Sequence, residues 1–217
     1  MTAIFTRLAF GLGLSAAIFG IGPAAAQTTA TDPAPATETA PAAAATDLSL
    51  GVPDGMPDQA NAEVGKVYLA ANFDAWEERC VKTADGSDPC QLYQLLKDES
   101  GNPTAEVSFF TLPDGGQAVM GATILVPLET LLTASLHISV DKAAAKLYPY
   151  SYCTINGCLA KVGFTADDLA TLKKGTNANV TIVPAAAPEN TVLLPISLKG
   201  FTAGYQAIRD AADKVKK

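Results

Sequence analysis

Apolar and polar residues alternate over several short segments of the chain, which is the pattern of half-buried β-strands. Turn-forming clusters of Gly, Pro, Asn, Asp and Ser separate these segments every ~10 to 15 residues. The predicted strands lie within Val67–Val81, Gln91–Leu96, Glu106–Leu112, Gln117–Pro127, Leu131–Asp141, Leu147–Cys153, Asn179–Val183 and Thr191–Ile196. Turns at this spacing predict an antiparallel β-sandwich or barrel-like domain.

Two of these strands allow more specific expectations. Gln117–Pro127 is the longest apolar run, so we expect a strand buried on both faces and paired with Leu131–Asp141. In the first segment, Trp76, Glu78 and Cys80 would lie on one face of an extended strand, because side chains alternate between the two faces. We interpret Trp76, the only tryptophan, as a core residue, because no neighbour supports a ligand-stacking role.

Two segments near the C-terminus have helical spacing instead. Thr165 and Asp168 form the pattern of a capping box, which marks the start of a helix. Phe201, Tyr205 and Ile208 recur at helical intervals in the last part of the chain. The predicted fold class is therefore mainly β, with two short helices near the C-terminus.

The N-terminal part of the chain does not share this patterning. Residues 1–26 combine one positive charge, an apolar run and Ala24-Ala25-Ala26, which is typical of a secretory signal peptide cleaved after Ala26. Residues 27–60 are rich in Ala, Pro and Thr and lack the apolar content of a folded core, so we expect a disordered linker. The remaining residues, 61–217, form the predicted domain. The chain is thus expected to be periplasmic or secreted, with no transmembrane span after cleavage.

Most of the negative charge lies in the linker. Residues 27–60 hold five acids and neither Lys nor Arg, whereas residues 61–217 hold only three more acids than bases. A nearly balanced domain has no strong field of either sign, so we expect no nucleic-acid partner.

Four cysteines in an exported chain predict two disulfides. Local turns favour the pairs Cys80–Cys90 and Cys153–Cys158. A redox pair and a zinc site are the alternatives, but the second pair has C-x₄-C spacing, and the chain has a single histidine. We therefore expect no metal and no cofactor.

The stretch from Tyr148 to Lys161 contains the second cysteine pair around Asn156-Gly157, a strong turn signal. If residues 147–153 are extended, Tyr148, Tyr150 and Tyr152 lie on one face. Tyrosines on a rigid hairpin give large contact area at low entropic cost. Tyr148, Tyr150, Tyr152 and Asn156 are therefore the candidate contact surface, and a packing ladder on the sheet is the alternative.

No catalytic motif is visible in the sequence. His137 lies in an apolar strand with no G-x-S-x-G nucleophile motif in the chain. The adjacent acids Glu77-Glu78 would point to opposite faces of a strand, and Asp167-Asp168 would occupy the first turn of a helix. We therefore assign no catalytic residue.

Several landmarks together resemble the invasion-associated locus B family of exported bacterial proteins. These landmarks are Trp76-x₃-Cys80, Cys90, Val126-Pro127-Leu128, Tyr150-Ser-Tyr-Cys153-x₄-Cys158-Leu-Ala, Asp168-Leu169…Leu172-Lys-Lys-Gly175 and Leu194-Pro-Ile-Ser-Leu-Lys-Gly-Phe201. The resemblance covers Tyr68 to Ala211. It implies a periplasmic or envelope-associated, mostly β domain with two disulfides, and it carries no catalytic residues. The family is named for a role in host-cell invasion.

The leading hypothesis is a non-enzymatic exported domain that binds a protein or another envelope component. An envelope hydrolase with an unrecognised site and a purely structural envelope protein are the alternatives. The sequence does not identify the partner or the oligomeric state.

Overall fold

The computed structural model describes residues 55–215, so the predicted signal peptide and most of the predicted linker lie outside the described residues. The elements are β1 (Val67–Phe73), β2 (Trp76–Val81), β3 (Cys90–Lys97), β4 (Pro103–Thr111), β5 (Met120–Val126), the 3₁₀ turn η1 (Leu132–Ala134), β6 (Leu136–Val140), β7 (Lys146–Tyr148), β8 (Tyr150–Thr154), β9 (Gly157–Phe164), α1 (Ala166–Lys174), β10 (Asn177–Ile182), β11 (Val192–Ser197) and α2 (Phe201–Val215). No helix among these residues is long and apolar enough to cross a bilayer.

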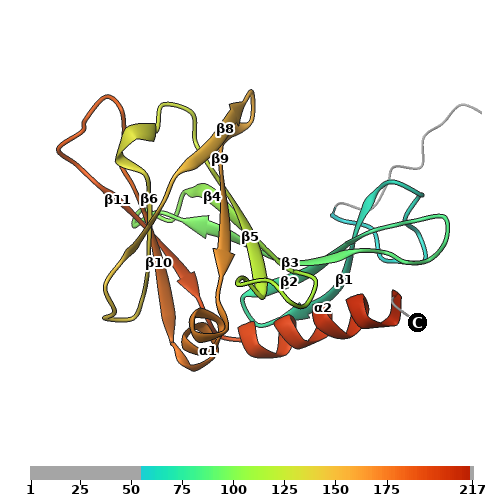
Figure 1. The fold of residues 1–217 in the computed structure, drawn as a ribbon. Coiled ribbons are helices and arrows are strands. Elements are labelled where there is room, and N and C mark those ends of the chain that lie inside the picture. The colour runs from blue at the N-terminus through green and yellow to red at the C-terminus, as the bar shows by residue number, and fades with distance from the viewer. Residues whose placement is uncertain (1–54, 216–217) are drawn as a thin grey trace, which may run out of the picture. The chain divides into compact units, whose positions relative to one another are not determined.

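The strands form two antiparallel sheets. One has seven strands in the order β1-β2-β3-β4-β5-β9-β8, and the other has four in the order β11-β10-β6-β7. The four-stranded sheet packs beside the β5–β9 part of the larger sheet, whereas β1–β3 extend away from it with α2 along one face (Figure 1). The predicted fold class, mainly antiparallel β with two helices, is confirmed.

An aromatic cluster forms the centre of the core. Trp76 is fully buried, and its ring centroid lies 5.5 Å from those of both Phe109 and Phe201. Trp76 therefore joins β2, β4 and α2, as expected of a core residue. The burial of Phe201, Tyr205 and Ile208 on one face of α2 confirms the helix predicted from their spacing.

The predicted pairing of Leu131–Asp141 with Gln117–Pro127 is wrong. β5 lies between β4 and β9, and β6 pairs instead with β10 and β7 in the other sheet. The connection between β5 and β6 crosses from one layer to the other, which strands of a sandwich often do, so neighbours in sequence need not pair. Local patterning predicts where a strand lies but carries little information about its partner.

One buried side chain joins the two sheets. Gln94 of β3 is 8% exposed, and its amide oxygen accepts from the Ser197 backbone N–H (2.9 Å) while its amide nitrogen donates to the Ser197 carbonyl (3.1 Å). A side-chain amide can satisfy both groups of one residue in this way, as a neighbouring strand would. Gln94 therefore fixes the end of β11 against β3.

We expect Gln94→Ala to lower the free energy of unfolding by about 1–3 kcal/mol, because both backbone groups of Ser197 lose their partner. Equilibrium urea denaturation measures the change. The matched control is Gln206→Ala on the exposed side of α2, which should change stability by less than ~0.5 kcal/mol. Equal midpoints for the two variants would contradict this role of Gln94.

Candidate functional site

The hairpin formed by β8 and β9 is closed by a disulfide between directly paired residues. Cys153 and Cys158 face each other across the two strands, with their Cα atoms 3.9 Å apart. Because Thr154 pairs with Gly157, the turn consists of Ile155 and Asn156, one residue earlier than the Asn-Gly pair suggested. Ile155, at this tip, is 93% exposed.

Gly157 begins β9 instead of completing the turn, and two features require glycine there. Its φ is +144°, a backbone angle that residues other than glycine rarely adopt. A Cβ at this position would also lie 2.3 Å from the Val126 carbonyl oxygen. The backbone at Gly157 therefore lies too close to the end of β5 to leave room for a side chain.

The three tyrosines do not form one row. A β-bulge between Tyr150 and Tyr152 inserts an extra residue, which turns the following side chain to the other face of the strand. Tyr148 packs on Phe164 with ring centroids 6.3 Å apart, and Tyr150 also packs against the core. Tyr152 is 50% exposed and lies beneath Lys161, whose Nζ is 5.5 Å from the ring centroid.

Of the four candidate contact residues, the structure therefore exposes Tyr152 and Asn156 and packs Tyr148 and Tyr150 inward. Burial raises the pKa of Tyr150 to about 12, because the phenolate would be poorly solvated. Tyr148 and Tyr150 are partly buried against the core, and a contact role for Tyr152 and Asn156 stays a prediction. The bulge could not be predicted, because alternation was the only signal available.

Loops from both sheets meet at the same end as the hairpin tip. β5 ends at Val126, directly opposite Cys158, and the chain continues through Leu128 to η1. This loop is tied to the β10–β11 loop by hydrogen bonds from the Leu131 N–H to the Val183 carbonyl and from the Ala185 N–H to the Glu129 carbonyl (both 2.7 Å).

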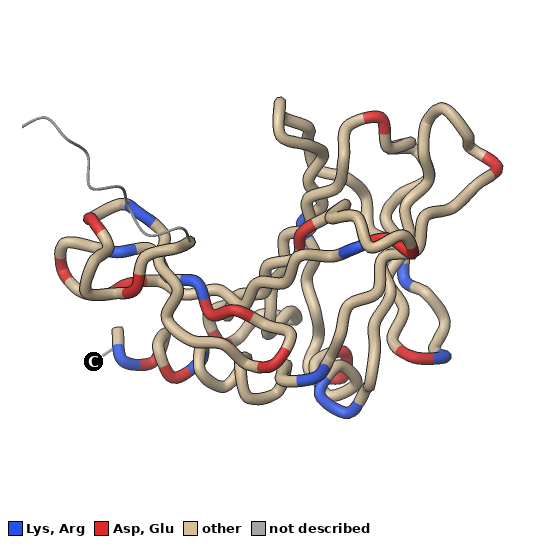
Figure 2. Tube along the Cα trace, turned by 180° about the vertical axis from the view of Figure 1, so that it is seen from behind, with Lys and Arg blue, Asp and Glu red and all other residues tan. Residues whose placement is uncertain are grey.

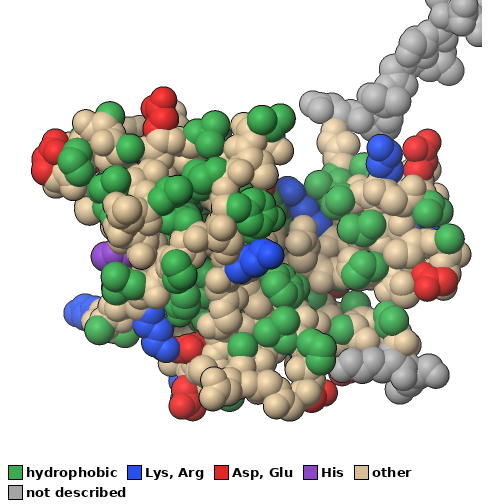
Figure 3. Space-filling view, turned by 45° about the horizontal axis from the view of Figure 1, so that its top comes forward, with side chains coloured by type: hydrophobic (Ala, Val, Ile, Leu, Met, Phe, Trp, Pro, Cys, Tyr) green, Lys and Arg blue, Asp and Glu red, His purple; other side chains and the backbone are tan. Residues whose placement is uncertain are grey.

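Four large apolar side chains are exposed at this end of the domain. We call them the apolar end; they are Leu128, Leu132, Tyr152 and Ile155, with 48%, 43%, 50% and 93% of their surface exposed. Hydrophobic side chains are spread over the corresponding face of the molecule (Figure 3). Sequence reasoning missed all but Tyr152, although an isoleucine in a turn between two cysteines was a usable signal.

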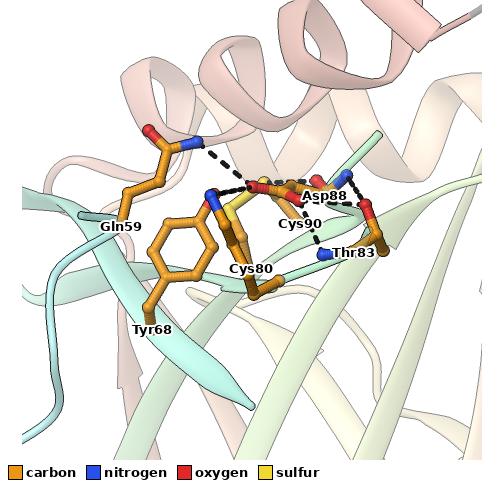
Figure 4. Close-up of a disulfide and its surroundings, with 7 residues drawn as sticks. Gln59, Tyr68, Cys80, Thr83, Asp88 and Cys90 are labelled. Atoms are coloured by element: carbon orange, nitrogen blue, oxygen red, sulfur yellow. Dashed lines mark hydrogen bonds and ion pairs between the residues drawn. A yellow bond between two sulfur atoms is a disulfide. The ribbon is translucent and has the colours of Figure 1, made fainter. Parts of the chain in front are cut away.

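The other disulfide lies beside a buried carboxylate. Cys80 and Cys90 are directly paired on β2 and β3, and Asp88 is only 7% exposed (Figure 4). Asp88 accepts from the Thr83 N–H (2.8 Å), the Tyr68 hydroxyl (2.8 Å) and the Gln59 amide (3.1 Å). The β2–β3 loop, β1 and the segment before β1 thus converge on one side chain.

These contacts shift the pKa values of the Asp88 carboxyl and the Tyr68 hydroxyl in opposite directions. The hydrogen bond from the Thr83 N–H, followed by that from Tyr68, lowers the pKa of Asp88 well below its usual value. Burial and then the bonded Asp88 carboxylate raise the pKa of Tyr68 to about 12. Gln59 belongs to the predicted linker, and the Pro57 carbonyl accepts from the Leu69 N–H at 2.9 Å, so contacts with the domain begin before residue 61.

The sequence pattern of the "Invasion associated locus B (IalB) protein" family matches residues 76–209, which is more than half of the chain. The chain belongs to this family. The match begins at Trp76, the residue at the centre of the core, and includes both disulfides and the hairpin.

Relatives support the same assignment. The invasion protein B homologues of Brucella abortus strain 2308 and of biovar 1 strain 9-941 are each 30% identical over 145 residues, which cover 67% of this chain and 82% of the relative. The fold is similar to the crystal structure of invasion associated protein B from Bartonella henselae, with a TM-score of 0.57 and 19% identity over 67% of this chain and 98% of that one.

The residues considered above for catalysis or metal binding make contacts that stabilise the fold. The His137 Nε2 lies 3.2 Å from the Ala134 carbonyl oxygen in the turn before its own strand. Asp168 completes the predicted capping box with Thr165. Glu78, Cys80 and Cys90 lie close enough together to hold an ion, but the disulfide removes both thiolates as ligands.

Along the described chain, Lys and Arg are interspersed with Asp and Glu (Figure 2). A protein that binds nucleic acid through its phosphates presents a concentrated basic surface. The expectation of no nucleic-acid partner stays a prediction.

We expect Gly157→Ala to destabilise the protein by about 3 kcal/mol, through backbone strain and the contact with the Val126 carbonyl. Gly101→Ala is the matched control, because Gly101 has φ +83° but no atom within 4 Å of the position that a Cβ would occupy; it should cost about 1 kcal/mol. Urea denaturation of both variants tests the difference, and equal losses would show that the close approach contributes nothing.

We expect Asp88→Asn to lower the urea midpoint at pH 7 and to lower it progressively less as the pH falls below about 4. A carboxyl whose pKa is lowered by folding stabilises the native state above its unfolded pKa, and this contribution is lost as the pH falls through the folded value. The exposed Glu99→Gln should follow the wild type throughout. A constant difference between Asp88→Asn and wild type down to pH 2 would contradict the role of the charge.

Proposed function

We propose that this protein is a non-enzymatic, exported binding domain that contacts a protein of the bacterial envelope through its apolar end. The observation that carries the proposal is the 93% exposure of Ile155 at the tip of a hairpin clasped by Cys153–Cys158. An exposed isoleucine in a turn contributes little to folding, and several large apolar side chains exposed at one end of a domain are a feature of protein–protein contact sites.

The rigidity of this surface supports the proposal. The disulfide, the pairing of β9 with β5 and the hydrogen bonds between the loops fix the apolar end before any partner arrives. A preorganised surface loses less conformational entropy on binding than a flexible one. Tyr152 adds an amphipathic ring of the kind enriched at binding surfaces.

Export is part of the same proposal. Disulfides form and persist in oxidising compartments such as the periplasm, and both pairs of cysteines are joined. The predicted signal peptide provides the route. The names of the relatives refer to invasion, and a surface that binds another protein is compatible with a role of that kind.

We expect Ile155→Asn to reduce recovery of the partner from a periplasmic extract at least tenfold, which corresponds to about 1.4 kcal/mol. Asparagine is well suited to a turn, so the hairpin should still form. Thermal melting checks the fold, and quantitative mass spectrometry of proteins captured on the immobilised mature chain measures recovery.

The matched control is Val64→Ser, which removes an apolar side chain that is 63% exposed in the segment before β1. It should capture the same protein as the wild type. Equal capture by Ile155→Asn would exclude the apolar end as the contact surface. If no protein is enriched by the wild type, the purely structural alternative is favoured instead.

A further inference from the structure

A small hollow lies beside α1. This helix is at the opposite end of the sandwich from the β8–β9 tip (Figure 1). The volume of the hollow is about 170 Å³. Most of its walls are apolar side chains from β6, β7, β9 and α1: Ile138, Val140, Tyr148, Phe164 and Leu172. Both sheets and a helix therefore contribute to one small apolar space.

The size of this hollow matches a small ligand. An apolar cavity of about 150 Å³ in another protein binds benzene, so 170 Å³ accommodates one aromatic ring or a short acyl chain. Ile138, Phe164 and Leu172 are each less than 7% exposed. Because these walls are held by the core, the space is formed before a ligand binds.

A cationic group is fixed at the rim. The Lys146 ammonium donates to Oδ1 of Asp168, while Oδ2 of Asp168 accepts from the N–H (3.1 Å) and hydroxyl (2.9 Å) of Thr165. The hydrogen bond to Asp168 raises the pKa of Lys146 further above its ordinary value, at which lysine is already protonated at neutral pH. An ammonium has three donors, so two stay available to a ligand, and the side chain is 58% exposed.

We propose that this hollow binds a small amphiphilic carboxylate, with its ring or short acyl chain between the apolar walls and its carboxylate on Lys146. The apolar walls supply affinity and the ammonium supplies selectivity for an anion. This site is separate from the apolar end and does not depend on the proposed function.

The larger hollow beside Cys80–Cys90, of about 430 Å³, does not present the same chemistry. Among its lining residues, Asp88 already accepts from Tyr68 and Gln59, and Ser87 donates to Asp85. Most of its lining residues are polar or charged, so it lacks the apolar walls that the hollow near α1 provides.

Benzoate is the probe, because it joins one ring to one carboxylate. Isothermal titration of the full exported chain, with both disulfides formed, should give saturable binding with a dissociation constant of about 1 mM, as expected for so small a ligand. Benzyl alcohol, which lacks the charge, should bind about tenfold more weakly, and the cationic benzylamine more weakly still.

Two pairs of variants locate the site. Ala144→Phe fills the hollow and should abolish benzoate binding, whereas Ala145→Phe, at the next exposed residue of the same turn but not in the wall, should not. Lys146→Gln should weaken benzoate about tenfold and leave benzyl alcohol unchanged. Its control, Lys142→Gln, lies on the same turn outside the wall and should bind like the wild type.

Thermal melting establishes whether each variant is folded. If Ala144→Phe does not fold, the comparison of Lys146→Gln with Lys142→Gln still tests the proposal. The proposal is wrong if the wild type shows no saturable benzoate binding up to about 20 mM. It is also wrong if folded Ala144→Phe binds as tightly as Ala145→Phe, or if Lys146→Gln and Lys142→Gln bind benzoate equally.

Discussion

The packing of Trp76 between Phe109 and Phe201 is the contact on which the rest of the domain depends. It joins β2, β4 and α2, which are far apart in sequence, in a fully buried cluster. The indole N–H has no hydrogen-bond partner among the described residues. The ring therefore stabilises the core through its apolar surface and not through its polar group. Large aromatic rings dominate core energetics because each buries ~150–250 Å².

The disulfides act locally around this core. Each joins two directly paired residues of neighbouring strands, and the short loops they close limit their stabilisation to about 2–3 kcal/mol each. One fixes the loop that carries Asp88, and the other fixes the tip that carries Ile155. Their main effect is therefore on the shape of two loops. The aromatic cluster holds α2 against the larger sheet, and the Gln94 bridge joins the two sheets.

The two ends of the sandwich offer different chemistry to a partner. The apolar end presents side chains outward on rigid loops, which suits another protein. The hollow near α1 combines apolar walls with Lys146 at its rim, which is the basis for the proposed small anionic ligand. Both ends depend on the antiparallel layers that place loops from different sheets next to one another.

Alternation, turn residues and helical spacing were sufficient to predict most strands, both helices, the burial of Trp76 and the pairing of cysteines, because each is decided by neighbours in the chain. The sequence resemblance also identified the family. The partner of β6, the bulge that separates Tyr152 from Tyr150 and the contact of Gln94 with Ser197 could not be predicted in this way. These features depend on which strands meet in space, and alternation is the same whichever strand is the partner. The local sequence therefore determined the elements and the disulfide of the hairpin. Only the tertiary structure decided which side chains reach solvent, because that depends on which strands pack together.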